Sequence, residues 1–147
     1  MAWASSELSR VERLVLAAYD WLMRALQPLL RRKLHRRAQH EPEYGLNVAQ
    51  RFGHYEGESP EGGFVWLHAV SLGETRAAAL LLPALRNAFP GMRLLLTHST
   101  ATGLAQGRTL MQAGDVQAWL PRDTAQATRQ FLMHFKPCIG LVMETEV

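Results

Sequence analysis

Cysteine, long apolar runs and glycine-rich phosphate-binding motifs are scarce or absent in this sequence. The 147 residues include one cysteine, Cys138, so no disulfide can form within the chain. No run of about 20 largely uncharged residues occurs, so the sequence predicts no membrane-spanning helix. Neither GxGxxG nor GxxxxGK followed by Ser or Thr is present, and dinucleotide and nucleoside-triphosphate binding lose their main support. We expect no cofactor.

Positive charge is concentrated at the N-terminus. Hydrophobic residues make up 48% of the chain and charged residues 20%, which is typical of a globular protein. Residues 1–40 hold eight Lys and Arg against three Asp and Glu, whereas the remainder holds eight against ten. The basic pI of about 9.5 therefore belongs to the N-terminal arm. A mildly acidic body argues against a nucleic-acid partner.

Residues 1–40 combine an apolar stripe with a basic cluster. Apolar residues recur at helical spacing: Val11, Leu14, Val15, Ala18, Leu22, Ala25, Leu26 and Leu29. Pro28 is expected to kink or end this helix, and a basic segment follows over residues 31–37. This pattern is typical of a helix that lies on an anionic membrane surface. The alternatives are a helix packed on its own domain with a solvated basic tail, and contact with RNA or DNA.

From residue 63 onward the pattern alternates between strands and helices. Residues 41–62 are expected to form a linker with a short helix over 44–55. Strands are then expected over 64–70, 92–97, 116–120 and 138–143, and helices over 75–89, 99–113 and 123–135. This order predicts an α/β fold with a Rossmann-like, doubly wound parallel sheet over residues 63–147.

Polar residues follow the strands of this predicted sheet, at the edge where parallel sheets bind ligands. Glu74 has two interpretations: a charge that stabilises the first turn of a helix, or a general base that deprotonates a hydroxyl nucleophile. Ser71 and Ser99 are candidates both for helix caps and for ligand contacts. His68 and His98 lack metal-ligand spacing, so they are interpreted as structural or substrate-contacting residues and no metal site is expected.

Five motifs in order carry a resemblance to a known family. They are Arg51-Phe52-Gly53, the segment 66–74 (WLHAVSLGE), the segment 97–103 (THSTATG), the segment 120–123 (LPRD) and the segment 143–146 (METE). Over about residues 44–147 the chain resembles the N-terminal half of bacterial 3-deoxy-D-manno-octulosonic acid (Kdo) transferases. The HAVSLGE segment is the strongest of these motifs.

The resemblance implies a GT-B glycosyltransferase, with two Rossmann-like domains that face a cleft. Such enzymes transfer Kdo from CMP-Kdo to a lipid A precursor at the cytoplasmic face of the inner membrane, and their N-terminal domain binds the acceptor. By motif, Glu74 resembles the general base, and Glu144 resembles a second acidic residue that acts at the transition state, with Glu146 as its alternative. The residues expected to line the acceptor pocket are Ser71, Gly73, Ser99, Thr100 and Gly103.

One departure from the family pattern concerns length. The family continues beyond the acidic stretch into a second, CMP-binding domain, whereas this sequence stops at Val147. We therefore expect a fragment that is inactive alone. Two other interpretations stay open: a peripheral membrane or partner-binding α/β module without catalysis, and a flavodoxin-like or Rossmann domain that binds an unrelated small ligand.

Overall fold

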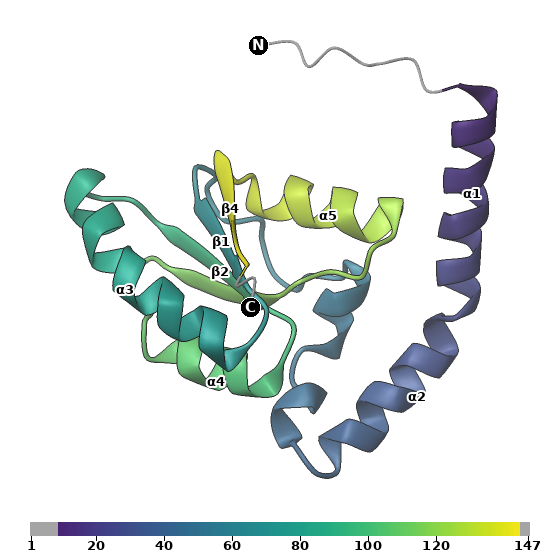
Figure 1. Cartoon of the computed structure of the whole chain (residues 1–147), viewed down its shortest axis with the longest axis horizontal. Helices are drawn as coiled ribbons and strands as arrows, with labels where there is room; N and C mark the ends of the chain where they lie inside the picture. The colour runs from purple at the N-terminus through teal and green to yellow at the C-terminus, as the bar shows by residue number, and fades with distance from the viewer. Residues whose placement is uncertain (1–8, 145–147) are drawn as a thin grey trace.

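A four-stranded parallel sheet forms the centre of the chain, whose residues 9–144 are described by a computed structural model (Figure 1). The strands are β1 (Val65–Ala69), β2 (Leu94–His98), β3 (Val116–Trp119) and β4 (Ile139–Met143). Their order across the sheet is β3-β2-β1-β4, and every neighbouring pair is parallel. The predicted α/β fold with a Rossmann-like parallel sheet is confirmed.

Three helices connect the strands: α3 (Leu72–Ala88), α4 (Ala101–Arg108) and α5 (Ala125–Phe135). Each begins directly after a hydroxyl residue, Ser71, Thr100 or Thr124, whose side chain accepts a hydrogen bond from an N–H three residues later. Helix α4 is shorter than the predicted 99–113. The Thr109 hydroxyl donates to the carbonyl of Gln106, 2.7 Å away, and turns the chain out of the helix.

The two faces of the sheet carry separate apolar cores. Helices α3 and α4 cover one face and α5 covers the other (Figure 1). Leu67, Leu94 and Leu96 pack with α3 on the first face, and Leu95 packs with Phe131 of α5 on the second. Successive strand residues point to opposite faces, and both faces are covered, so β2 is buried along its whole length.

The N-terminal arm is a pair of helices, α1 (Arg10–Ala25) and α2 (Gln27–Ala38). Pro28 lies in the first turn of α2, so the helix predicted from the apolar stripe ends just before the proline as expected. The single short helix predicted within 44–55 is wrong. Two 3₁₀ helices, η1 (Pro42–Gly45) and η2 (Val48–Phe52), take its place, because Asn47 between them has a positive φ of 47°.

Helix α1 contacts the body through its polar side. The Tyr19 hydroxyl donates to Asp123 (3.1 Å), and the Asp20 carboxylate accepts from the N–H of Ala125 (3.0 Å) at the start of α5. A carboxylate is favourable there because a helix N-terminus carries partial positive charge. The apolar stripe lies on the other side of α1 and is exposed: Val11 69%, Leu14 70%, Val15 62% and Leu22 51%.

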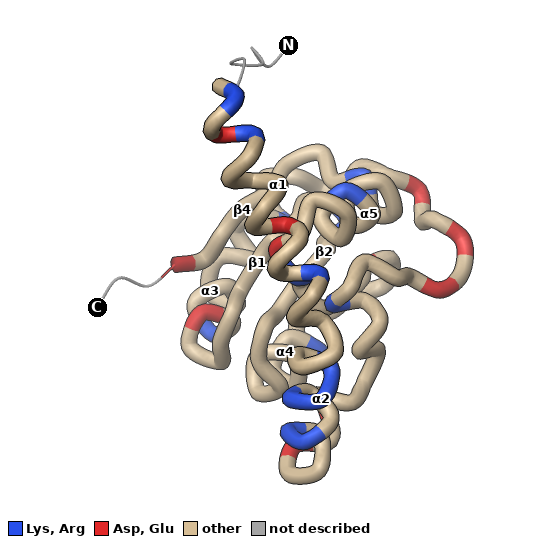
Figure 2. The backbone as a smooth tube through the Cα atoms, turned by 90° about the vertical axis from the view of Figure 1, so that its right-hand side faces the viewer, with Lys and Arg blue, Asp and Glu red and all other residues tan. Residues whose placement is uncertain are grey.

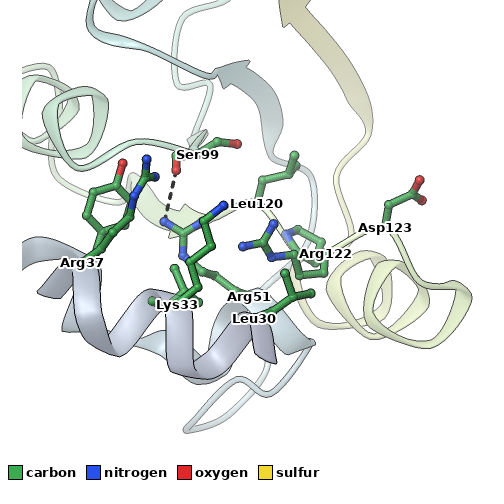
Figure 3. A pocket seen from close by; sticks show the side chains of 11 residues that line it. Leu30, Lys33, Arg37, Arg51, Ser99, Leu120, Arg122 and Asp123 are labelled. Carbon is green, nitrogen blue, oxygen red and sulfur yellow. Dashed lines mark hydrogen bonds between the residues drawn. The ribbon is translucent and has the colours of Figure 1, made fainter. Parts of the chain in front are cut away.

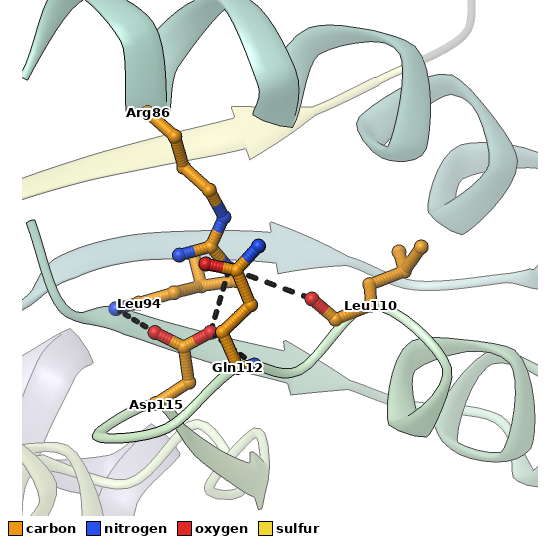
Figure 4. Close-up of polar contacts among 5 residues, drawn as sticks. All are labelled: Arg86, Leu94, Leu110, Gln112 and Asp115. Carbon is orange, nitrogen blue, oxygen red and sulfur yellow. Dashed lines mark hydrogen bonds and ion pairs between the residues drawn. The ribbon is translucent and has the colours of Figure 1, made fainter. Parts of the chain in front are cut away.

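An ion pair closes the amino edge of the sheet, opposite the edge where ligands are expected (Figure 4). The side chain of Asp115 is 1% exposed, and its carboxylate contacts the Arg86 guanidinium at 2.6 Å. The same carboxylate accepts from the N–H groups of Leu94 and Gln112, both at 2.8 Å. Arg86 also donates to the carbonyl of Leu110 at 3.4 Å. Both charges are thus compensated inside the fold.

Gly107 of α4 is required for packing, whereas Gly73 of α3 is not. A Cβ at Gly107 would collide with the side chains of His98 and Gln117, but a Cβ at Gly73 would meet only Ser71 Oγ, at 3.9 Å. In an unobstructed helix, Gly→Ala stabilises by about 0.4–1 kcal/mol. We expect Gly107→Ala to destabilise by about 1–3 kcal/mol through overpacking, and Gly73→Ala to be neutral or stabilising. Urea unfolding followed by circular dichroism checks both, and a stabilised Gly107→Ala variant would contradict the packing account.

Candidate functional site

The carboxyl edge of the sheet is organised around the peptide groups of Val70, just after β1. The carbonyl of Val70 accepts from the N–H groups of Ser99 (3.3 Å) and Thr100 (3.1 Å) and from the Thr100 hydroxyl (2.9 Å). Its N–H donates to the Glu74 carboxylate. One residue therefore links the end of β1 to the starts of both α3 and α4.

Glu74 lies at this edge, in the first turn of α3, and is half-buried. One carboxylate oxygen accepts from the N–H of Val70, and the other accepts from the Ser71 hydroxyl at 3.2 Å. The Ser71 hydroxyl accepts in turn from the N–H of Glu74 at 3.4 Å. This arrangement resembles a capping box and fixes the carboxylate. Each oxygen keeps a second lone pair, so a fixed base at the mouth of the sheet is compatible with the geometry.

The other predicted lining residues have different positions. Gly73 is exposed beside Glu74. Thr100 caps α4, and Gly103 is buried behind it, where a Cβ would approach Thr100 Oγ1 at 3.0 Å and the Val70 carbonyl at 3.2 Å. Gly103 therefore lets α4 pack closely against the edge. The structure brings Ser71, Gly73 and Thr100 to one edge, but it places Gly103 in the packing beneath.

Glu144 follows β4 and is exposed. In the sheet register Met143 pairs with Ala69, so Glu144 leaves the sheet alongside Val70, whose N–H is bound by Glu74. The two glutamates thus follow neighbouring strands at the same edge. Glu146, the alternative to Glu144, lies outside the described residues.

A pocket of about 360 Å³ lies beside this edge, between α2 and the ends of β2 and β3 (Figure 3). We call it the cationic pocket, because four basic side chains line it: Lys33, Arg37, Arg51 and Arg122. Ser99 is the predicted site residue that reaches it, and its carbonyl accepts from Arg51 Nη2 at 3.2 Å. Figure 2 shows the Lys and Arg residues gathered along α2, which forms one wall.

Sequence reasoning missed the cationic pocket. Arg51 and Arg122 lie within two of the motifs noted above, and Lys33 and Arg37 lie in the basic segment, but nothing in the sequence shows that these segments meet. The backbone supplies the connection, because the N–H of Arg122 donates to the carbonyl of Arg51 at 2.7 Å. One signal was available in the sequence: two of the motifs, Arg51-Phe52-Gly53 and the segment 120–123, contain an arginine to which no catalytic role was assigned.

His68 and His98 are buried structural residues. His98 Nδ1 donates to the carbonyl of Ala69 (2.9 Å), so Nε2 is the acceptor for Gln117 Nε2 (3.0 Å) and the ring is neutral. Burial lowers the pKa of His98 to about 4. Burial also lowers the pKa of His68, whose Nδ1 lies 2.9 Å from Thr97 Oγ1. Hydrogen bonds hold both rings inside the fold at the ends of β1 and β2.

Within residues 9–144 no helix is both long and apolar enough to cross a membrane. The arm instead presents its apolar residues along one side of α1.

Comparison with known proteins identifies the family. The sequence profile described as 3-deoxy-D-manno-octulosonic-acid transferase (kdotransferase), an N-terminal glycosyltransferase profile, matches residues 46–147. The chain belongs to this family. The matched range includes Glu74, Glu144, Arg51 and Arg122, whereas Lys33 and Arg37 of the arm lie before it.

Three relatives show the extent of the similarity. The 3-deoxy-D-manno-octulosonic acid transferase of Bordetella pertussis is 44% identical over 137 residues, which cover 88% of this chain and 32% of that protein. A probable mitochondrial 3-deoxy-D-manno-octulosonic acid transferase of Arabidopsis thaliana is 30% identical, and that of Haemophilus influenzae is 29% identical. Both matches cover 88% of this chain, and 29% and 30% of those proteins. The chain therefore spans about a third of the length of these Kdo transferases. No solved structure matches it.

The buried His98 predicts a pH-dependent stability. Its pKa is about 4 in the folded chain, below the ordinary 6.5, so the unfolded chain binds more protons between these values. The contribution of the neutral His98 to the free energy of unfolding is complete above pH 6.5 and is lost as the pH falls toward 4. We expect the free energy of unfolding to drop by about 2 kcal/mol between pH 7 and pH 5 on account of His98.

Urea unfolding at several pH values measures this effect. In His98→Gln the free energy of unfolding should depend less on pH. In His40→Gln, a change at an exposed position, it should depend on pH as in the parent. A parent whose stability is the same at pH 5 and pH 7 would show that His98 is not held neutral by the fold.

Proposed function

We propose that this chain is the acceptor-binding N-terminal part of a glycosyltransferase that transfers Kdo from CMP-Kdo to a lipid A precursor. The observation that carries the proposal is the family match over residues 46–147, together with the HAVSLGE segment at the carboxyl edge of a parallel sheet. Ligands of parallel sheets bind at that edge. The site for CMP-Kdo then belongs to the part of the protein by which the relatives exceed this chain.

In this mechanism Glu74 is the general base. Its carboxylate removes the proton from an acceptor hydroxyl while that oxygen attacks the anomeric carbon of Kdo, and the bond from this carbon to the phosphate of CMP breaks. The hydrogen bonds from Val70 and Ser71 fix the carboxylate, which reduces the reorganisation that proton transfer requires. Ser71, Gly73, Ser99, Thr100 and Gly103 form or support the acceptor side of the site.

Glu144 has an electrostatic role in the proposal. Positive charge develops on the sugar ring when the bond to CMP weakens, and a carboxylate beside the ring stabilises it. Glu144 is exposed at the end of β4, on the strand next to the one that leads to Glu74. Glu146 remains the alternative for this role.

The arm is proposed to bind the cytoplasmic surface of the inner membrane without crossing it. The polar side of α1 is attached to α5 through Tyr19 and Asp20, so the exposed apolar stripe is free to enter a membrane interface. The basic residues of α2 follow directly and would attract anionic lipid headgroups. The exposed stripe equally supports the second candidate, a non-catalytic module that docks on a membrane or a partner.

A variant of the proposed base separates these two functions. We expect Glu74→Gln to lower turnover by about 10²–10⁴-fold, because the amide oxygen of glutamine can still accept from the N–H of Val70 but the side chain cannot take up a proton. The assay is Kdo transfer by a chimera in which this chain replaces the matching third of the Bordetella pertussis relative. Glu58→Gln in the exposed loop before β1 is the matched control.

Glu144→Gln in the same chimera should also lower turnover, with less dependence on pH than Glu74→Gln, because its role is electrostatic. If Glu74→Gln transfers Kdo at the parental rate with an unchanged acidic limb of the pH profile, Glu74 only stabilises the first turn of α3 and the catalytic assignment is wrong.

Membrane binding by the arm is tested with vesicles. We expect the chain to co-sediment with anionic vesicles and to be released as salt increases, since exposed charges are screened within about 8 Å at physiological ionic strength. Leu14→Glu, in the exposed stripe of α1, should weaken co-sedimentation at least tenfold by placing a charge in the interface, an order-of-magnitude expectation. Leu80→Glu is the control, because Leu80 is 85% exposed but lies on α3. Equal binding to neutral and anionic vesicles would refute the electrostatic part.

A further inference from the structure

The cationic pocket holds positive charge that the described part of the chain does not neutralise. Among residues 9–144, none of its four basic side chains forms a salt bridge. Among the described residues of the lining, Asp123 is the single carboxylate, and it points away from the guanidinium groups (Figure 3). Its carboxylate accepts instead from the Tyr19 hydroxyl. Burying uncompensated charge is costly unless a counter-charge is supplied.

Arg51 shows this most clearly. It is 4% exposed, and its guanidinium lies 3.7 Å from the ring centroid of Trp119. Within residues 9–144, the bond to the Ser99 carbonyl is the only hydrogen bond of its side chain, and the enclosed Nε–H groups of Arg51 and Arg122 have no acceptor. Burial, together with the charge of Arg122, lowers the pKa of Arg51 to about 10, so it is still protonated at neutral pH.

Arg86 provides an internal comparison. Its side chain is 17% exposed, and the fold places the Asp115 carboxylate against it at 2.6 Å. Within residues 9–144, the fold therefore neutralises an arginine at the amino edge of the sheet and leaves three guanidinium groups and one lysine ammonium without a salt bridge at the ligand edge. Stacking on Trp119 explains how Arg51 is held, but not why its charge lacks a partner.

We propose that the cationic pocket binds a phosphate monoester group. A guanidinium fork matches phosphate oxygens, and a monoester carries about −1.5 to −2 charges at pH 7, which suits several cations better than one carboxylate does. The volume of about 360 Å³ is larger than a phosphate group needs and falls in the range of small-molecule sites. Leu30, Tyr44 and Leu120 provide an apolar wall for the group that carries the phosphate.

Binding is measured by NMR titration of the 147-residue chain at constant ionic strength, with inorganic phosphate and glucose 1-phosphate as probes and glucuronate as the carboxylate control. The signals to follow are the Nε–H groups of Arg51 and Arg122 and the indole N–H of Trp119, which donates to the Leu46 carbonyl. We expect saturable shifts with both phosphates and much weaker ones with glucuronate.

Two neighbouring residues of α2 supply the variant and its control. Lys33 lines the cationic pocket and is exposed, so Lys33→Gln should fold normally and weaken phosphate affinity about tenfold, as expected for a lost charged contact. Arg32→Gln removes the same charge next to it, outside the lining, and should bind like the parent. Arg122→Gln should match Lys33→Gln. Equal losses in Lys33→Gln and Arg32→Gln, equal binding of glucuronate, or no saturable shift would each overturn the proposal.

Vesicles distinguish a lipid phosphate from a free one. Binding to vesicles is compared for the two variants. If Lys33→Gln binds phosphatidic acid vesicles more weakly than Arg32→Gln does, but the two variants bind vesicles of the diester phosphatidylglycerol equally, the ligand is a lipid-borne monoester. The same difference with glucose 1-phosphate alone supports a soluble ligand. These measurements do not depend on sugar transfer, so the phosphate site and the proposed glycosyltransferase function can fail separately.

Discussion

The fold of this chain depends on the peptide groups of Val70. Its carbonyl is shared by the N–H groups of Ser99 and Thr100 and by the Thr100 hydroxyl, and its N–H is bound by Glu74. Parallel strands bring their carboxyl ends to one edge, but only such local bonds fix the loops that leave them. The two crossover helices therefore start from a common point, with Gly103 close behind it. A displacement of this residue would move the proposed base and the caps of both helices together.

Charged side chains are neutralised at one end of the sheet and not at the other, and this difference distinguishes the structural edge from the proposed binding edge. At the amino edge, Arg86 and Asp115 neutralise each other and satisfy nearby backbone groups. At the carboxyl edge, the Glu74 carboxylate is fixed by hydrogen bonds, and within residues 9–144 neither this carboxylate nor Arg51 and Arg122 form a salt bridge. Uncompensated charge is costly in a folded protein, so its concentration at one edge is expected of a binding site.

Much of the fold was predictable from the sequence, because strands buried on both faces are continuous apolar runs and hydroxyl residues mark helix starts. The break at Pro28 followed from its missing N–H. The two 3₁₀ helices did not follow, since Tyr44 and Phe52, on either side of the left-handed Asn47, pack against Leu34 and Ala101 from distant parts of the chain. Motif positions placed Glu74 and Glu144 at one edge. The cationic pocket was out of reach, because α2, η2 and the end of β3 meet there through long-range contacts.

The arm carries the exposed apolar stripe and also forms one wall of the cationic pocket. Its first helix is anchored by Asp20 at the start of α5, and its second packs Leu34 against Tyr44 and Phe52. The anchors lie on the polar side of α1 and on the apolar side of α2, so α1 presents its apolar stripe outward while α2 turns Lys33 and Arg37 toward the ends of the strands. The apolar stripe proposed to enter a membrane interface and the cationic pocket proposed to bind phosphate therefore lie on different helices of one arm. The bend at Pro28 is what allows one short segment to provide both.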